Sequence, residues 1–328
     1  MIGIFKQKAP GNVALLLILG LVLKLPLFLS PKIAATTPLD GKLYSALVLW
    51  ITKNNAVFSS GIIAFILLYV QALAITGIIN EYRMTARSNF LPGMAYMMIT
   101  SLLPEWSFLS APLIATTFII WAFAMLFQLY NNEYANTKIF NIGLLLGVSS
   151  LFYFPSLLFV VCIIVGLLIL RSFRLNEIFL LILGAITPYY FYGVYLFLTD
   201  QLSLNKLIPV IDFQLPPLTT SLWIVGAILL LTIPFLTGGY YIQTQLRKML
   251  IQARKNWSIV LLYLFFALFI SFVNNGGNYT NWVIAIAPFS AFHASAYFYP
   301  PRTWLTTILF FGTIAFILAQ QYVTNAWQ

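Results

Sequence analysis

Long apolar runs separated by short polar segments organise the whole chain. Repeated runs of about 20 apolar residues are typical of membrane-spanning helices, whereas a membrane barrel shows short segments of alternating hydrophobicity. The pattern therefore predicts an all-α, polytopic integral membrane protein with about eleven transmembrane helices. These form a single membrane domain over residues 1–328, and no soluble domain is expected.

The predicted spans differ in length. The third, fifth and sixth are short for a bilayer of about 30 Å, so we expect them to be tilted, broken or partly inserted. The eleven spans are Asn12–Leu29, Ser59–Ile79, Phe90–Leu103, Ala111–Tyr130, Ile139–Phe154, Leu157–Leu170, Ile178–Phe197, Leu222–Ile242, Ile259–Val273, Trp282–Phe298 and Trp304–Val323.

Composition supports the same class. Hydrophobic residues make up 61% of the chain and charged residues only 7%. Soluble proteins carry about a quarter charged residues, so this chain could not cover a water-facing surface. The first apolar run follows Lys6 and Lys8, as in a signal peptide, but it leads into SPKIAATTPLDGK without a convincing cleavage site. We therefore expect it to be retained as the first span.

The net charge of +10 is explained by orientation in a membrane. Basic residues gather in alternate loops, so we predict a cytoplasmic N-terminus, a C-terminus on the outer side and no nucleic-acid partner. The inner segments carry Lys6, Lys8, Arg83, Arg87, Lys138, Arg171, Arg174, Arg247, Lys248, Arg254, Lys255 and Arg302, whereas the outer segments carry Lys32, Lys42, Lys53 and Lys206.

Few residues are available for chemistry inside the membrane. Cys162 is the one cysteine and His293 the one histidine, which excludes a disulfide framework and a Cys/His metal cluster. We expect His293 to be a hydrogen-bonded packing residue. None of the seven carboxylates lies within a span, which argues against a proton pathway. Lys24 is the one cation within a span, and we expect it to snorkel toward the outer interface.

The loop after the first span holds the most informative carboxylate. The chain breaks at Pro26 and Pro31 and restarts as a short helix near Asp40. A carboxylate there can act as a base for a lipid-dependent transferase. From the residues alone, the more common role of such a carboxylate is to stabilise the start of the helix by accepting backbone N–H bonds, with support from the helix dipole. The other outer carboxylates are Glu105, Asp200 and Asp212.

Three stretches together resemble the GT-C superfamily, the membrane glycosyltransferases that use polyprenyl-phosphate-linked sugars. The first is Lys24–Pro26 followed by Asp40 and Tyr44. The second is the glycine-rich run Ile142–Phe159, which leads to an aromatic-proline break, and the third is Asn278–Phe292. With eleven predicted spans, the resemblance extends over most of the chain.

The resemblance implies transfer of a sugar from a polyprenyl-phosphate carrier at the outer face of a bacterial inner (cytoplasmic) membrane. Asp40 would be the base or would orient the acceptor hydroxyl, and Glu105 would be a supporting carboxylate or a ligand of a divalent cation. No metal site is predicted from the residues themselves. The partners implied are membrane lipid and the lipid-linked sugar donor. The implied substrate contacts are Lys42, Tyr44, Lys206 and Tyr279.

Two departures from the family pattern keep other functions open. Gly41 follows Asp40 where many members have Glu, and Asn278 precedes Tyr279 where many have Arg. The missing guanidinium removes an expected phosphate contact, since lysine is a poorer planar partner. One alternative is a non-catalytic membrane subunit or scaffold that binds other proteins of a cell-envelope machine. Another is a carrier or flippase for a lipid or polyprenol.

Overall fold

A computed structural model describes residues 2–33, 36–37, 39–132, 135–200, 221–272, 279–301 and 303–323. These residues form helices joined by short turns, with two isolated backbone bridges and no strand among them, so the all-α prediction is confirmed. The α-helices are α1 (Ile2–Phe5), α2 (Gly11–Leu23), α3 (Leu25–Leu29), α4 (Lys42–Lys53), α5 (Val57–Glu81), α6 (Leu91–Ile99), α7 (Ala111–Phe127), α8 (Asn136–Phe152), α9 (Phe159–Leu170), α10 (Leu175–Leu198), α12 (Leu222–Gln245), α13 (Ile251–Ser271), α14 (Val283–Phe298) and α15 (Thr303–Val323).

Each predicted span overlaps a helix, or two helices in the case of α2 and α3, with bounds that differ by several residues in places. Among the described residues, five segments are long and apolar enough to cross a membrane, and three shorter helices are also apolar. These helices are compatible with an integral membrane protein. The five are Val57–Glu81, Leu175–Leu198, Leu222–Lys248, Ile251–Ser271 and Trp304–Gln321.

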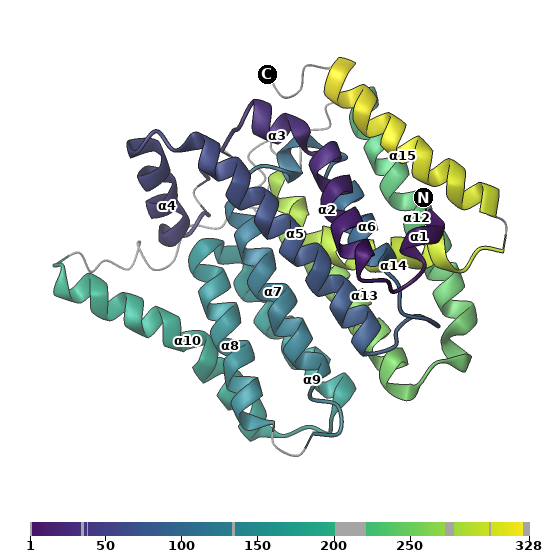
Figure 1. Ribbon diagram of the computed structural model, residues 1–328. Helices are drawn as coiled ribbons and strands as arrows, with labels where there is room; N and C mark the ends of the chain where they lie inside the picture. The colour runs from purple at the N-terminus through teal and green to yellow at the C-terminus, as the bar shows by residue number, and fades with distance from the viewer. Residues whose placement is uncertain are drawn as a thin grey trace.

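The centre of the bundle is built from two helices that other helices enclose (Figure 1). All nine residues of α6 are buried, and α14 is buried from Val283 to Tyr297. The two pack against each other, α5 also packs on α6, and α12 and α13 also pack on α14. This explains why the third predicted span is short: α6 is a core helix surrounded by protein.

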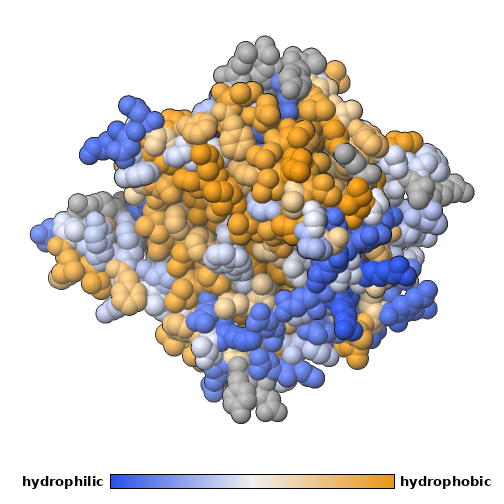
Figure 2. All heavy atoms as spheres, in the orientation of Figure 1, coloured by the Kyte–Doolittle hydropathy of each residue, from blue (hydrophilic) through white to orange (hydrophobic). Residues whose placement is uncertain are grey.

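The outer surface of the bundle carries large apolar side chains. Leu198 is 75% exposed, Leu222 is 87% exposed, and several aromatic residues of α10 are exposed above 60%. Figure 2 shows a broad hydrophobic region over the middle of the molecule, with hydrophilic residues gathered toward its edges. An exposed apolar surface of this extent is unusual for a soluble monomer and suits contact with lipid.

Glycine allows α8 and α10 to approach each other closely. A Cβ on Gly143 would lie 2.1 Å from the carbonyl oxygen of Leu181, and one on Gly147 would lie 2.4 Å from that of Ala185. Small residues at helix crossings let backbones pack closely in membrane bundles. The glycines of the second resemblance stretch therefore have a packing role in this fold.

His293 connects two helices of the core. Its Nε2 lies 2.8 Å from the carbonyl oxygen of Leu231, which joins α14 to α12. The expectation of a hydrogen-bonded packing histidine is confirmed.

Candidate functional site

The loop that carries Asp40 pairs with the break that follows α8. Asp40 and Tyr153 face each other in an antiparallel bridge. The amide of Gly41 donates to the carbonyl of Phe152 at 2.7 Å, and the amide of Phe154 donates to the carbonyl of Leu39 at 3.2 Å. These two bonds flank the pair, which is therefore of the non-hydrogen-bonded type. Such pairs hold their side chains on one face and close together.

The carboxylate of Asp40 accepts a hydrogen bond from its own loop. The amide of Thr37 donates to Oδ2 of Asp40 at 2.6 Å. The N-cap of α4 is Gly41, and no side chain caps that helix. Of the two roles considered from the sequence, capping of α4 by Asp40 is therefore not observed. The carboxylate does accept a backbone N–H bond, but it closes the turn before the helix. Burial raises the pKa of Asp40 to about 6, although the hydrogen bonds from Thr37 oppose the shift.

Gly41 is required by the close approach of the two segments. A Cβ at this position would lie 1.7 Å from the carbonyl oxygen of Leu151, so a larger residue would push the loop away from α8. The glycine that departs from the GT-C pattern thus has a steric reason in this fold. It keeps Asp40 beside Tyr153.

The side chain of Tyr153 is fully buried, and its hydroxyl has no hydrogen-bond partner among the described residues. A buried hydroxyl without a partner costs free energy. A tyrosine hydroxyl can both donate and accept, so a bound polar group could satisfy it. Sequence reasoning did not select Tyr153 as a site residue, although it lies within the second resemblance stretch. The feature of the sequence that could have identified Tyr153 is its position directly before the aromatic-proline break at Phe154–Pro155.

Tyr44 fixes the base of the same loop. Its side chain is fully buried, and its hydroxyl donates to the carbonyl of Leu109 at 3.1 Å. Ile33 also forms a parallel bridge with Leu109. Burial raises the pKa of Tyr44, and the nearby charge of Asp40 raises it further. The predicted substrate contact is therefore a buried neighbour of Asp40 that anchors the loop to residues 100–110, the segment between α6 and α7.

Glu105 lies in the same connecting segment and binds the third resemblance stretch. The amide of Tyr279 donates to Oε2 of Glu105 at 2.6 Å, and Nε1 of Trp106 donates to the carbonyl of Tyr279 at 2.8 Å. Burial raises the pKa of Glu105, and the bond from Tyr279 opposes this shift. The two side chains hold both backbone groups of Tyr279 just before α14. Glu105 and Asp40 are thus held by different partners.

Lys24 is buried at the junction of α2 and α3. Its side chain is 0% exposed, and Nζ donates to Oγ of Ser107 at 2.8 Å. Ser107 in turn donates to the carbonyl of Thr100 at 2.9 Å. The prediction that Lys24 snorkels to the interface is wrong, because the helix breaks at this residue and directs the side chain into residues 100–110.

The remaining predicted site residues do not join this cluster by a described contact. Lys42 is exposed at the first turn of α4, beside Gly41. Lys206 and Asp212 lie outside the described residues, as does Asn278. Among the residues that the structure describes, no group of three or more His, Cys, Asp and Glu side chains comes together. The candidate site thus consists of Asp40 and Tyr153, with the buried Tyr44 close to Asp40.

Comparison with protein families gives a match that covers most of the chain. Residues 16–327 match a family described as "Family of unknown function (DUF6427)". The chain belongs to this family. The match runs from within α2 to beyond α15 and includes all three resemblance stretches. Neither curated proteins nor solved structures give a match.

Proposed function

We propose that this member of the DUF6427 family is a GT-C-like glycosyltransferase of a bacterial inner membrane. It crosses the membrane eleven times with its N-terminus in the cytoplasm. It transfers a sugar from a polyprenyl-phosphate carrier to an acceptor at the outer face. One observation carries the proposal: two stretches that resemble the GT-C pattern, far apart in the sequence, pair so that Asp40 lies opposite Tyr153.

The chemistry assigned to the pair follows from its environment. Asp40 accepts the proton of the acceptor hydroxyl as the new glycosidic bond forms. A base works best when its pKa is close to the working pH, and burial raises the pKa of Asp40 to about 6. The unpartnered hydroxyl of Tyr153 donates a hydrogen bond to an oxygen of the substrate. Both groups lie on one face of the bridge.

The donor lipid requires a cation at the surface and an apolar path beside it. Lys42 is exposed at the start of α4 and supplies charge to the departing phosphate. The same helix exposes Leu49 at 68% and Trp50 at 61%. A short helix with exposed leucine, tryptophan and lysine suits the headgroup region of a bilayer. We therefore place α4 in the outer leaflet, where it guides the lipid phosphate toward Asp40.

The test uses the full chain in proteoliposomes with a panel of polyprenyl-phosphate hexoses. Release of polyprenyl phosphate is the readout. Asp40→Asn keeps an oxygen that can accept from Thr37 and removes the charge, so turnover should fall about 100-fold or more. Tyr153→Phe should lower it by a smaller factor. The exposed Tyr195→Phe is the matched control. Full turnover in Asp40→Asn, or none in the folded wild type with any donor, would overturn the proposal.

A second candidate is a non-catalytic membrane subunit of an envelope machine. It is favoured because two predicted site residues make structural hydrogen bonds. The hydroxyl of Tyr44 donates to the carbonyl of Leu109, and the carboxylate of Glu105 accepts from the amide of Tyr279. This candidate predicts that the wild type has no turnover with any donor. It also predicts that the folded chain co-purifies with the same envelope proteins whether residue 40 is Asp or Asn.

A further inference from the structure

A cluster of exposed cations lies at the end of the bundle away from Asp40. Helix α5 begins beside α4 at Val57 and ends at Glu81, so the turn between α5 and α6 lies at that far end. The corner between α12 and α13, which includes the short 3-10 helix η3 (Leu246–Lys248), supplies the other members. We call the cluster the basic patch; it consists of Arg83, Arg87, Arg247, Lys248 and Arg254.

Packing between helices holds the two segments of the basic patch together. Nε1 of Trp257 donates to the carbonyl of Met84 at 2.9 Å, which joins the turn to the first part of α13. Tyr299, at the end of α14, hydrogen-bonds to the backbone of Ala86. Its ring also stacks on Tyr241 of α12, with centroids 6.5 Å apart. The turn is therefore fixed against α13 and α14, with the end of α12 beside it.

The cations of the basic patch have no partner within the described part of the chain, where neither a salt bridge nor a side-chain hydrogen bond involves them. Neighbouring cations on the side of α9 and α10 differ. Arg171 lies 3.2 Å from Glu177 and donates to the carbonyl of Asn132 at 2.7 Å. Lys255 donates to the carbonyl of Leu170 at 3.2 Å. A bias of cations toward one membrane face does not require this division.

The charge of the basic patch favours an anionic partner. Glu81 is the one carboxylate in the described segments 81–90 and 246–255, and it makes no salt bridge with the patch. Five cations thus face one carboxylate across two segments that packing holds together. Complementary charge steers and selects binding partners. Figure 2 shows hydrophilic residues gathered on the side of the molecule where the turn between α5 and α6 lies.

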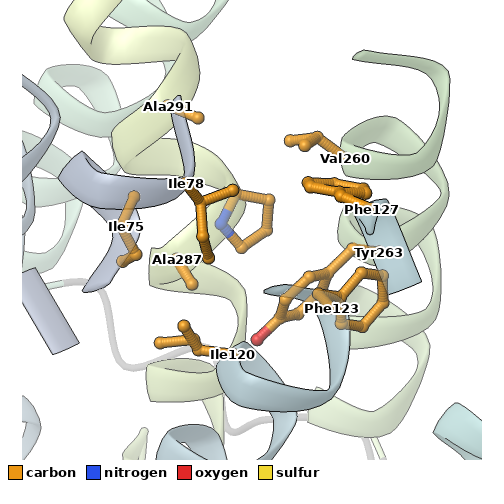
Figure 3. Close-up of a pocket in the computed structure, with 10 residues that line it drawn as sticks. Ile75, Ile78, Ile120, Phe123, Phe127, Val260, Tyr263, Ala287 and Ala291 are labelled. Carbon is orange, nitrogen blue, oxygen red and sulfur yellow. The ribbon is translucent and has the colours of Figure 1, made fainter. Parts of the chain in front are cut away.

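The interior beside the basic patch is closed to a ligand of this kind. The space between α5, α7, α13 and α14 is about 40 Å³ and is lined almost wholly by apolar atoms (Figure 3). Ile78 lines it three residues before Glu81, and Val260 lines it six residues after Arg254. A partner at this end of the bundle must therefore bind on the surface.

Apolar side chains within the corner select a lipid as that partner. Leu250 is 59% exposed and Ile251 is 57% exposed, and both lie between Lys248 and Arg254 in the sequence. The flanking segments Leu222–Lys248 and Ile251–Ser271 are long and apolar enough to cross a membrane, so the corner between them lies at a membrane surface. Cations beside exposed aliphatic residues suit the headgroup region, where phosphate and acyl chain are both within reach.

We propose that the basic patch binds the phosphate group of an anionic phospholipid, whose acyl chains lie along Leu250 and Ile251. The guanidinium groups of Arg247 and Arg254 bind phosphate through paired N–H groups. A zwitterionic phospholipid binds more weakly, because its own ammonium group is repelled by the patch. The site is at the opposite end of α5 from Asp40, so it does not depend on the proposed transfer reaction.

The test is native mass spectrometry of the full chain in detergent, titrated with phosphatidylglycerol or with phosphatidylcholine of the same acyl chains. The wild type should bind phosphatidylglycerol at least about tenfold more tightly. The double variant Arg247→Gln, Lys248→Gln should lose most of this preference. The double variant Lys138→Gln, Arg174→Gln removes the same charge from cations that have partners of their own, and it should bind as the wild type does.

A second measurement separates binding from folding. Arg247 and Lys248 are exposed and unpaired among the described residues, so their double variant should unfold within a degree or two of the wild type in neutral detergent. Added phosphatidylglycerol should raise the thermal midpoint of the wild type and the control, and change that of the patch variant little.

Three outcomes would overturn the proposal. One is an equal loss of preference in both double variants, which would mean that net charge alone attracts the lipid. Another is a wild type that binds the two phospholipids equally. The third is binding of glycerol phosphate or of polyglutamate as tightly as phosphatidylglycerol, which would assign the patch to a soluble anion.

Discussion

Asp40 and Tyr153 lie directly opposite each other in a bridge between the loop after the first predicted span and the break after α8. The backbone bonds on either side of the pair are 2.7 and 3.2 Å long. A half-buried carboxyl group is thereby held beside a fully buried hydroxyl that has no partner among the described residues. The proposed chemistry rests on this pair. Four predictions test the pair and the contacts made by the segment between α6 and α7.

The first prediction concerns pH. Burial raises the pKa of Asp40 from 3.8 to about 6, so the folded protein binds this proton more tightly than the unfolded chain. The resulting stabilisation is fully present below about pH 4 and is lost as the pH rises through 6. Asp40→Asn should therefore be more stable than the wild type at pH 7.5, by on the order of 1 to 3 kcal/mol.

Thermal unfolding in detergent at pH 4 and pH 7.5 checks this prediction. The two proteins should differ little at pH 4, where both side chains are neutral. A lower midpoint for Asp40→Asn at pH 7.5 would mean that the bond from Thr37 to the charged carboxylate outweighs the cost of burial. In the transfer assay, the wild-type rate should rise as Asp40 loses its proton near pH 6.

The second prediction concerns Gly41. Its Cα lies so close to the carbonyl of Leu151 that a methyl group would collide with backbone. Gly41→Ala should therefore lower stability by about 1 to 3 kcal/mol and separate Asp40 from Tyr153. Gly77→Ala is the matched control, since a Cβ there meets no atom within 4 Å. If both variants unfold at the wild-type temperature, the two segments do not meet as described.

The third prediction separates positioning from catalysis at Glu105. Glu105→Ala leaves the amide of Tyr279 without its acceptor and should cost about 1 to 3 kcal/mol of stability. Glu105→Gln retains an acceptor oxygen and should unfold within a degree or two of the wild type. If Glu105 only holds Tyr279, the Gln variant also keeps full transfer activity. A stable but inactive Gln variant would instead assign the charge a role in the reaction.

The fourth prediction concerns the buried cation. Lys24 donates to Ser107 and lies wholly inside the bundle. Burying an ammonium group is costly unless its charge is paired, so Lys24→Met, which keeps a long flexible chain, should raise the thermal midpoint. Ser107→Ala removes the acceptor and should lower it. A destabilised Met variant would show that Lys24 contributes more through its hydrogen bond than its burial costs.

The sequence was sufficient to predict the fold class and the approximate positions of the long apolar helices. Membrane-compatible helices require long apolar runs, and such runs are visible without any knowledge of tertiary contacts. The break near Pro26 was also predictable, since proline lacks an amide donor. The packing role of His293 was also predictable, because one histidine and one cysteine are too few to form a metal-binding cluster. These are local properties of the chain.

The candidate site was only partly predictable. Asp40 stood out because carboxylates are scarce, yet its partner Tyr153 did not, because tyrosine is common in this chain and its burial depends on distant segments. The incorrect prediction that Lys24 snorkels to the interface has the same cause, because its burial also depends on segments far away in the chain. Side-chain direction at a helix break is set by whatever packs there, and here it is Ser107 in the segment between α6 and α7.

By itself, the amino-acid sequence determined the fold class and the course of the helices, because burial of backbone polar groups in an apolar environment leaves an α-helix as the structure for each apolar run. Tertiary structure decided which polar groups meet. It placed Asp40 against Tyr153, tied Glu105 to the backbone of Tyr279 and enclosed α6 at the centre of the bundle. These contacts join segments far apart in the chain, and hydrophobic periodicity carries no information about them.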